Sequence, residues 1–144
     1  MRPAPVNTFE ALLDRARGFH TPHMAVAAAG EEAVIASVAH AMREGLIAPV
    51  LVGDAARIRA IAARQAVDLG PVKIIDLPDP AAASAAAVRL VHEGQTALVM
   101  KGLVTTREFV RAVLNRELGM RGGRPLHHDV DVVIGSLHAG IALA

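Results

Sequence analysis

The chain of 144 residues contains no cysteine, tryptophan or tyrosine and only three phenylalanines. The lack of cysteine excludes a disulfide scaffold, a thiolate metal site and a cysteine nucleophile. So few aromatic rings leave little from which to build a stacking platform for single-stranded nucleic acid. Charge of one sign is not in excess either, because 15 Lys and Arg stand against 14 Asp and Glu. This balance excludes the broad basic field of a general nucleic-acid binder, although it leaves room for a local anion site.

Long hydrophobic runs are also missing, although 53% of the residues are hydrophobic. Alanine inflates that fraction, and no window offers the roughly twenty bulky apolar residues that a membrane span needs. Residues 1–7 carry one charged side chain without a following apolar run, which is not the pattern of a secretory signal. We therefore expect a soluble cytoplasmic protein with no membrane partner, folded as a single domain over residues 1–144.

Short β-branched or apolar runs alternate with alanine-rich stretches of helical spacing. The runs predict strands at 24–28, 50–52, 72–76, 97–100 and 130–134. Helices are expected at about 8–17, between the first two strands, at about 54–66 and 79–93, and after Thr105. Strands separated by helices of this length favour right-handed βαβ units. The sequence therefore predicts a three-layer α/β fold, a mostly parallel sheet with helices on both faces.

Residue types that cap or stop helices stand at the expected helix ends. They are Asn7 with Glu10, Gly45, Asp54, Pro80 and Gly94. A further pattern, Thr105-Thr106-Arg107-Glu108, has the capping-box form.

Ligands of open α/β sheets bind beyond the carboxyl ends of the strands, so the strand-to-helix turns are where a site is expected. One turn combines a cation, Lys101, with a glycine, Gly102, and the hydroxyls of Thr105 and Thr106. Together with the free N–H groups of the following helix, these are the parts of an anion site. A surface lysine beside a threonine cap would give the same pattern. The turn lacks the Walker spacing, and no Gly-x-Gly-x-x-Gly occurs, so a dinucleotide fold is unsupported.

The other strand-to-helix turns offer less to an anion. Glu31 and Glu32 place two carboxylates at a helix N-terminus, which we interpret as compensation of the helix dipole. The turn at 51–54 is a glycine turn followed by an N-cap, and the turn at 76–80 is stiff and acidic.

Two further groups of residues invite a functional interpretation. Arg121 and Arg124 flank paired glycines, where a phosphate contact and a solvated loop are both open. Histidines at 20, 23, 127 and 128 suggest a metal, but adjacent residues of a strand point to opposite faces and no helical His-Glu-x-x-His completes a set. We expect no metal site.

The chain resembles the phosphate acetyl/butyryltransferase family over about residues 25–128. The resemblance is carried by residues 26–31, 45–54, 73–76, 91–94, Leu98-Val99-Met100-Lys101-Gly102 with Thr105 three residues on, and 111–121. It implies an enzyme that moves an acyl group between coenzyme A and inorganic phosphate, with coenzyme A as a substrate and no metal or redox cofactor. It also implies two α/β domains of the isocitrate-dehydrogenase-like type, an active site in the cleft between them, and a homodimer or larger assembly.

The resemblance implies a substrate-binding role for six residues. They are Lys101, Gly102, Thr105, Thr106, Arg121 and Arg124. His128 is a candidate general base because of its chemistry and location, and His127 stands where the family usually has a serine.

From about Asp129 the resemblance fades, and we expect the family's second domain to be absent, as in a truncated copy. Three functions stay open. The first is a phosphate acyltransferase that converts acetyl- or butyryl-coenzyme A and phosphate to acyl phosphate and coenzyme A. The second is a non-catalytic phosphate- or coenzyme A-binding or assembly module, and the third is an unrelated small-molecule-binding α/β domain.

Overall fold

The computed structural model describes residues 8–18, 20–115 and 131–133. Along the chain the elements are α1 (Phe9–Arg17), β1 (His23–Ala27), α2 (Glu32–Arg43), β2 (Ala48–Gly53), α3 (Ala55–Arg64), β3 (Lys73–Asp76), α4 (Pro80–His92), β4 (Leu98–Lys101), α5 (Thr106–Val113) and β5 (Asp131–Val133). The predicted strands are confirmed within two residues at each end.

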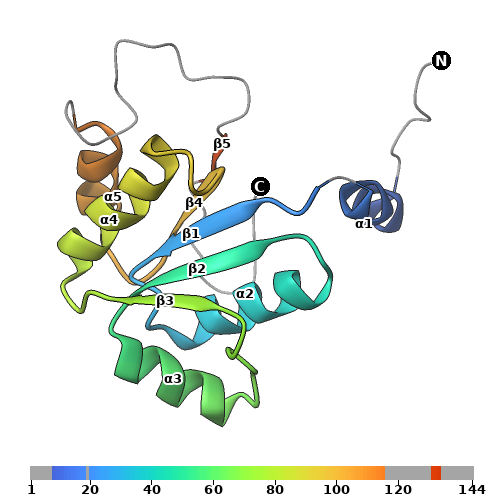
Figure 1. Cartoon of the computed structure of the whole chain (residues 1–144), viewed down its shortest axis with the longest axis horizontal. Helices are drawn as coiled ribbons and strands as arrows, with labels where there is room; N and C mark the ends of the chain where they lie inside the picture. The colour runs from blue at the N-terminus through green and yellow to red at the C-terminus, as the bar shows by residue number, and fades with distance from the viewer. Residues whose placement is uncertain (1–7, 19, 116–130, 134–144) are drawn as a thin grey trace.

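The strands form one sheet in the order β3-β2-β1-β4-β5, and every pairing between them is parallel. Helices α2 and α3 cover one face and α4 and α5 cover the other (Figure 1). The predicted three-layer α/β fold is confirmed. The chain moves outward from β1 through β2 to β3 and then returns to the other side of β1. The direction of winding therefore switches between β1 and β4, which is where open α/β sheets bind ligands.

The face under α2 and α3 is built from larger aliphatic side chains. Val26 and Leu51 point to it from the sheet, and Ile35, Ile58 and Ile61 meet them from the two helices. All five are at most 2% exposed. Because successive residues of a strand face opposite sides, the neighbours of Val26 and Leu51 belong to the other layer.

The face under α4 and α5 is packed with small residues. Ala25 and Ala27 of β1 lie with Ala83 and Ala87 of α4 in one buried cluster, all four of them fully buried. Alanines on both sides let the helix approach the sheet closely. Phe109 of α5 is also fully buried in this cluster and supplies its largest side chain.

The predicted helix ends are confirmed for the interior helices. Asp54 Oδ1 accepts a hydrogen bond from the Arg57 backbone at 3.1 Å, and Asp79 caps α4 in the same way. Gly45 and Gly94 follow α2 and α4 with φ of +72° and +76°, the left-handed conformation that favours glycine.

The first helix and the first strand differ from the prediction in detail. Thr8 caps α1, since its Oγ1 accepts from the Ala11 backbone N–H at 3.1 Å, one residue after the predicted Asn7, which lies outside the described residues. Ala28, predicted as the last residue of the first strand, is instead a turn residue with φ of +54°. A left-handed alanine is uncommon and costs energy, so the contacts around this turn must hold it.

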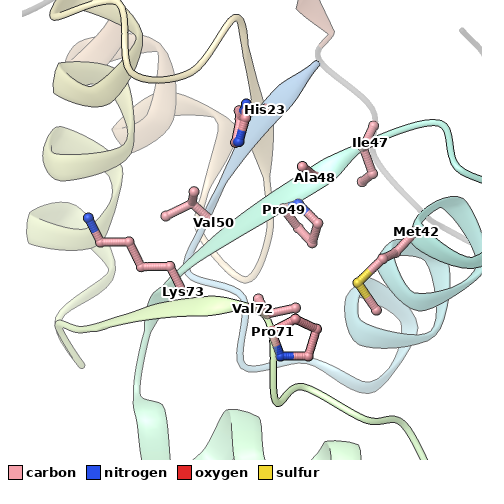
Figure 2. A pocket seen from close by; sticks show the side chains of 9 residues that line it. All are labelled: His23, Met42, Ile47, Ala48, Pro49, Val50, Pro71, Val72 and Lys73. Atoms are coloured by element: carbon pink, nitrogen blue, oxygen red, sulfur yellow. The ribbon is translucent and has the colours of Figure 1, made fainter. Parts of the chain in front are cut away.

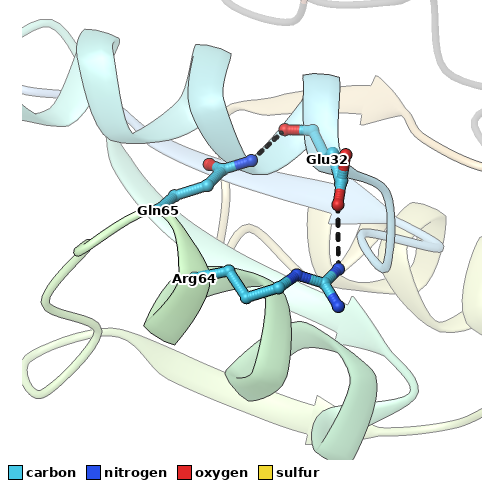
Figure 3. Close-up of polar contacts among 3 residues, drawn as sticks. All are labelled: Glu32, Arg64 and Gln65. Carbon is cyan, nitrogen blue, oxygen red and sulfur yellow. Dashed lines mark hydrogen bonds and ion pairs between the residues drawn. The ribbon is translucent and has the colours of Figure 1, made fainter.

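An interaction between α2 and α3 was not predicted. Arg64 at the end of α3 forms an ion pair with Glu32 at 2.9 Å, and Gln65 Nε2 donates to the Glu32 backbone oxygen at 2.9 Å (Figure 3). Glu32 thus has an ion partner in addition to its place in the first turn of α2.

Helix α1 stands apart from the layers (Figure 1). Its Phe9 and Leu12 are exposed. None of the described helices combines the length and the hydrophobicity that crossing a membrane requires.

Candidate functional site

The turn that follows β4 is bound directly to the turn that follows β1. The backbone N–H of Gly102 donates to the Ala27 oxygen at 2.7 Å, and the N–H of Leu103 donates to the Ala28 oxygen at 2.7 Å. A Cβ atom on Gly102 would lie 2.5 Å from the Ala27 oxygen and would also collide with the Ala28 carbonyl. Glycine is therefore needed at position 102 for the two turns to meet.

The turn that follows β1 is held from its other side by the end of β2. The Ala29 N–H donates to the Val52 oxygen at 3.1 Å. A Cβ atom on Gly53 would lie 3.0 Å from the Ala29 nitrogen. The left-handed Ala28 therefore lies between two glycine-containing turns, one after β4 and one after β2. The centre of the carboxyl edge of the sheet is formed by the backbone of these turns.

Lys101 is the last residue of β4, and it pairs with Ala27 across the switch point. The prediction placed it just beyond the strand. Its side chain is half-buried, and within the described part of the chain its ammonium has no hydrogen-bond or ion-pair partner. An unpartnered cation at the switch point is what an anionic ligand needs there.

The structure distinguishes the two predicted threonines. Thr105 Oγ1 accepts from the Glu108 backbone N–H at 3.2 Å and donates to the Glu108 carboxylate at 3.0 Å, so the predicted capping box is confirmed. Its hydroxyl is engaged on both sides, and binding a substrate there would require the box to open. Thr106 is exposed, and its hydroxyl has no partner among the residues described.

Of the seven predicted site residues, the structure brings four together at the carboxyl edge, namely Lys101, Gly102, Thr105 and Thr106. Arg121, Arg124 and His128 lie outside the described residues. Their predicted roles stay predictions.

Residues around the first two strand-to-helix turns belong to this edge as well, although the sequence pattern of those turns favoured a purely structural role. Ala28 accepts a hydrogen bond from Leu103 in the turn after Lys101, and Gly53 lies against Ala28 and Ala29 in the turn after β1. The sequence signal for this part of the site was Gly53 at the end of a strand, but a glycine in an ordinary turn gives the same pattern.

The hollow in Figure 2 lies at the opposite edge of the sheet. It has a volume of about 420 Å³ and is lined by His23, Met42, Ile47, Ala48, Pro49, Val50, Pro71, Val72 and Lys73. Apart from Met42, which lies in the last turn of α2, these residues stand at or near the amino ends of β1, β2 and β3. None of the predicted site residues is among them. In the described ranges no group of three or more His, Asp or Glu residues is placed to hold a metal ion.

The sequence is similar to curated phosphate butyryltransferases and phosphate acetyltransferases. It is 39% identical over 120 residues to a phosphate butyryltransferase of Clostridium beijerinckii, which covers 83% of this chain and 40% of that protein. It is 36% identical over 126 residues to a phosphate acetyltransferase of Rhizobium meliloti, which covers 88% of this chain and 40% of that protein. No protein-family model matches the sequence.

Solved structures share the fold. A phosphotransacetylase from Streptococcus pyogenes superposes with a TM-score of 0.62 at 16% identity, over 74% of this chain and 42% of that chain. One from Staphylococcus aureus gives 0.60 at 14% identity, over 76% and 42%. The chain spans about 40% of the length of the curated relatives it matches. Sequence and fold together place this chain in the phosphate acetyl/butyryltransferase family, as a match to the N-terminal portion of its members.

Proposed function

We propose that this chain forms one wall of a phosphate acyltransferase site, in which an acyl group passes between coenzyme A and inorganic phosphate. The observation that carries the proposal is the unpartnered ammonium of Lys101 at the switch point of the sheet, beside the N-terminus of α5. The similarity to a phosphate butyryltransferase and a phosphate acetyltransferase supports the same reaction.

The proposed chemistry uses these groups to hold phosphate and to stabilise developing charge. A phosphate oxygen forms a bond to the thioester carbonyl carbon, the carbon–sulfur bond breaks, and coenzyme A leaves as a thiolate that takes up a proton. Lys101 would neutralise part of the phosphate charge, and the Thr106 hydroxyl with the first N–H groups of α5 would donate to its oxygens. Gly102 contributes by letting the turn that carries Lys101 seat against Ala28.

The remaining parts of the proposal concern residues and partners beyond this edge. Arg121 and Arg124 would add phosphate contacts, and His128 would act as general base. Coenzyme A is the proposed acyl carrier, without a redox cofactor or a metal, in a cytoplasmic homodimer or larger assembly. Because the relatives are more than twice as long, we propose that a second wall completes the cleft, since turnover requires both reactants to be held in place.

The experiment is thioester formation from acetyl phosphate or butyryl phosphate and coenzyme A, with the purified chain. The chain offers a matched control because it contains two lysines, Lys73 and Lys101. If a second copy of the chain supplies the other wall, the wild type turns over; Lys101→Ala should then abolish that turnover, whereas Lys73→Ala, at the opposite edge of the sheet, should leave it unchanged.

Binding of inorganic phosphate, followed by calorimetry, provides a second readout. Phosphate binding that depends on Lys101 without turnover would identify a binding module, the alternative function. Folded protein that binds neither phosphate nor coenzyme A would refute the proposal.

A further inference from the structure

Arg57 lies close to the proposed site but has no role in the phosphate contacts proposed above. It lies in the first turn of α3, directly after β2. A Cβ atom on Gly30 would lie 3.2 Å from Arg57 Cδ and 3.6 Å from its Nε. The arginine side chain therefore packs against the turn between β1 and α2, and the absence of a side chain at Gly30 makes room for it.

The guanidinium of Arg57 is exposed and makes no hydrogen bond or ion pair within the described ranges. The carboxylates of this region are engaged elsewhere. Asp54 and Asp76 each accept from a backbone N–H in the first turn of α3 at 3.1 Å, and Glu32 is paired with the arginine at the end of that helix. Glu31 stands at the N-cap position of α2, where its side chain makes no capping hydrogen bond, and it is not paired with Arg57. Among the described residues the carboxyl edge thus presents several unpartnered cations, Arg107 in the first turn of α5 included. Two of them adjoin the residues around Ala28: Lys101 pairs with Ala27, and Arg57 packs against Gly30.

These two cations flank the same turn from opposite sides. Lys101 ends β4 and Arg57 follows β2, and both strands are neighbours of β1. Two strand spacings separate β4 from β2, which is roughly 10 Å. Lys101 is in register with Ala27, which packs on the α4 and α5 face, whereas Arg57 belongs to α3 on the other face. The two cations therefore approach the edge from opposite faces of the sheet, an arrangement that suits a ligand carrying phosphates at some distance from its reacting group.

We propose that Arg57 binds a phosphate of the nucleotide end of coenzyme A on the β2 side of the turn. This inference rests on the proposed function, in which Lys101 holds the transferable phosphate on the β4 side. Coenzyme A has the required chemistry, because its pyrophosphate and 3′-phosphate are joined to the reactive thiol through the long pantetheine arm. A guanidinium suits such groups, since it offers two parallel N–H donors to phosphate oxygens.

The test compares coenzyme A binding to the full chain and to charge variants of α3. Arg57→Gln removes the charge while keeping an aliphatic stem against Gly30. Arg57→Lys keeps a charge but lacks the two parallel N–H donors of the guanidinium. Arg59→Gln is the matched control, because Arg59 is exposed on the same helix and lies about 200° further around it at 3.6 residues per turn.

We expect Arg57→Gln to weaken coenzyme A binding about tenfold, the size of a charge-assisted contact. Arg57→Lys should recover part of that loss, and Arg59→Gln should bind as the wild type does. Binding of inorganic phosphate and of pantetheine should be the same in all four proteins, and dephospho-coenzyme A shows which phosphate is contacted. Thermal unfolding confirms that each variant is folded.

The two proposals fail in different ways. If the wild type binds coenzyme A and folded Arg57→Gln binds it equally well, the role of Arg57 is overturned while the proposed function stands. If the wild type binds neither coenzyme A nor phosphate, the proposed function fails and the role of Arg57 fails with it.

Discussion

Substitution of Gly102 by alanine tests whether the turns after β1 and β4 meet as described. The added methyl group would sit 2.5 Å from the Ala27 oxygen and against the Ala28 carbonyl. Both obstacles are backbone atoms, which cannot rotate away as a side chain would. One turn must therefore move, and the hydrogen bonds from the Gly102 and Leu103 N–H groups, each 2.7 Å long, are strained or lost.

The expected loss of stability follows from these contacts. A methyl group forced into a packed site costs about 1–3 kcal/mol, and each weakened hydrogen bond about 0.5–1.5 kcal/mol. We expect Gly102→Ala to lower the free energy of unfolding by about 3 kcal/mol, a large part of the roughly 5–15 kcal/mol that holds a protein folded.

Gly45→Ala is the matched control. Gly45 has φ of +72° but no heavy atom within 4 Å of its added Cβ, so the variant suffers torsional strain alone, about 1 kcal/mol. Urea denaturation followed by circular dichroism separates the two variants. At a slope of about 2 kcal/mol/M, a loss of about 3 kcal/mol lowers the midpoint by about 1.5 M and a loss of about 1 kcal/mol lowers it by about 0.5 M. A Gly102→Ala protein no less stable than Gly45→Ala would refute the contact between the turns.

Four further substitutions test other parts of the structure. Thr105→Val removes the capping box and should cost about 1 kcal/mol in thermal unfolding; we expect phosphate affinity to be retained, which would withdraw the predicted substrate role of Thr105. Thr106→Val should do the reverse in the same two assays, lowering phosphate affinity with little change in stability. Arg64→Ala should change the urea midpoint very little, since the Arg64–Glu32 pair is 63% and 69% exposed and such pairs contribute about 0–1 kcal/mol. Phe109→Ala, which empties a fully buried site, should cost about 3–5 kcal/mol by urea denaturation; a loss below 1 kcal/mol would contradict the packing of α5.

The local elements could be predicted from the sequence because their causes are local. Asp54 and Glu108 lie within three residues of the groups they bind, and Gly45 ends α2 by its own backbone freedom. Ala28 could not be predicted as a turn residue. As an apolar residue it continues the run that predicts the strand. Its left-handed conformation depends on contacts around Gly53 and Gly102, which are 25 and 74 positions away in the chain.

The candidate site was predicted in part for the same reason. Lys101, Gly102 and the threonines are close in sequence, so their shared turn was visible. Arg57 was not predicted as a site residue. Its proximity to that turn depends on its packing against Gly30 and on the strand order β2-β1-β4, which the sequence does not show. The engagement of the Thr105 hydroxyl with Glu108 was implicit in the predicted capping box, yet its consequence for substrate binding needed the observed hydrogen bonds.

By itself the sequence determined the alternation of strands and helices, the parallel three-layer architecture and the turn that carries Lys101. Hydrophobic periodicity, helix caps and glycine helix stops depend on residues a few positions apart, so they can be recognised from the sequence. The tertiary structure alone decided that β1 and β4 lie side by side at the switch point, that Gly102 must be a glycine for its turn to reach Ala28, and that Arg57 faces the same edge as Lys101. Those facts depend on which distant segments pack together, and that is settled by the burial of whole faces of the sheet.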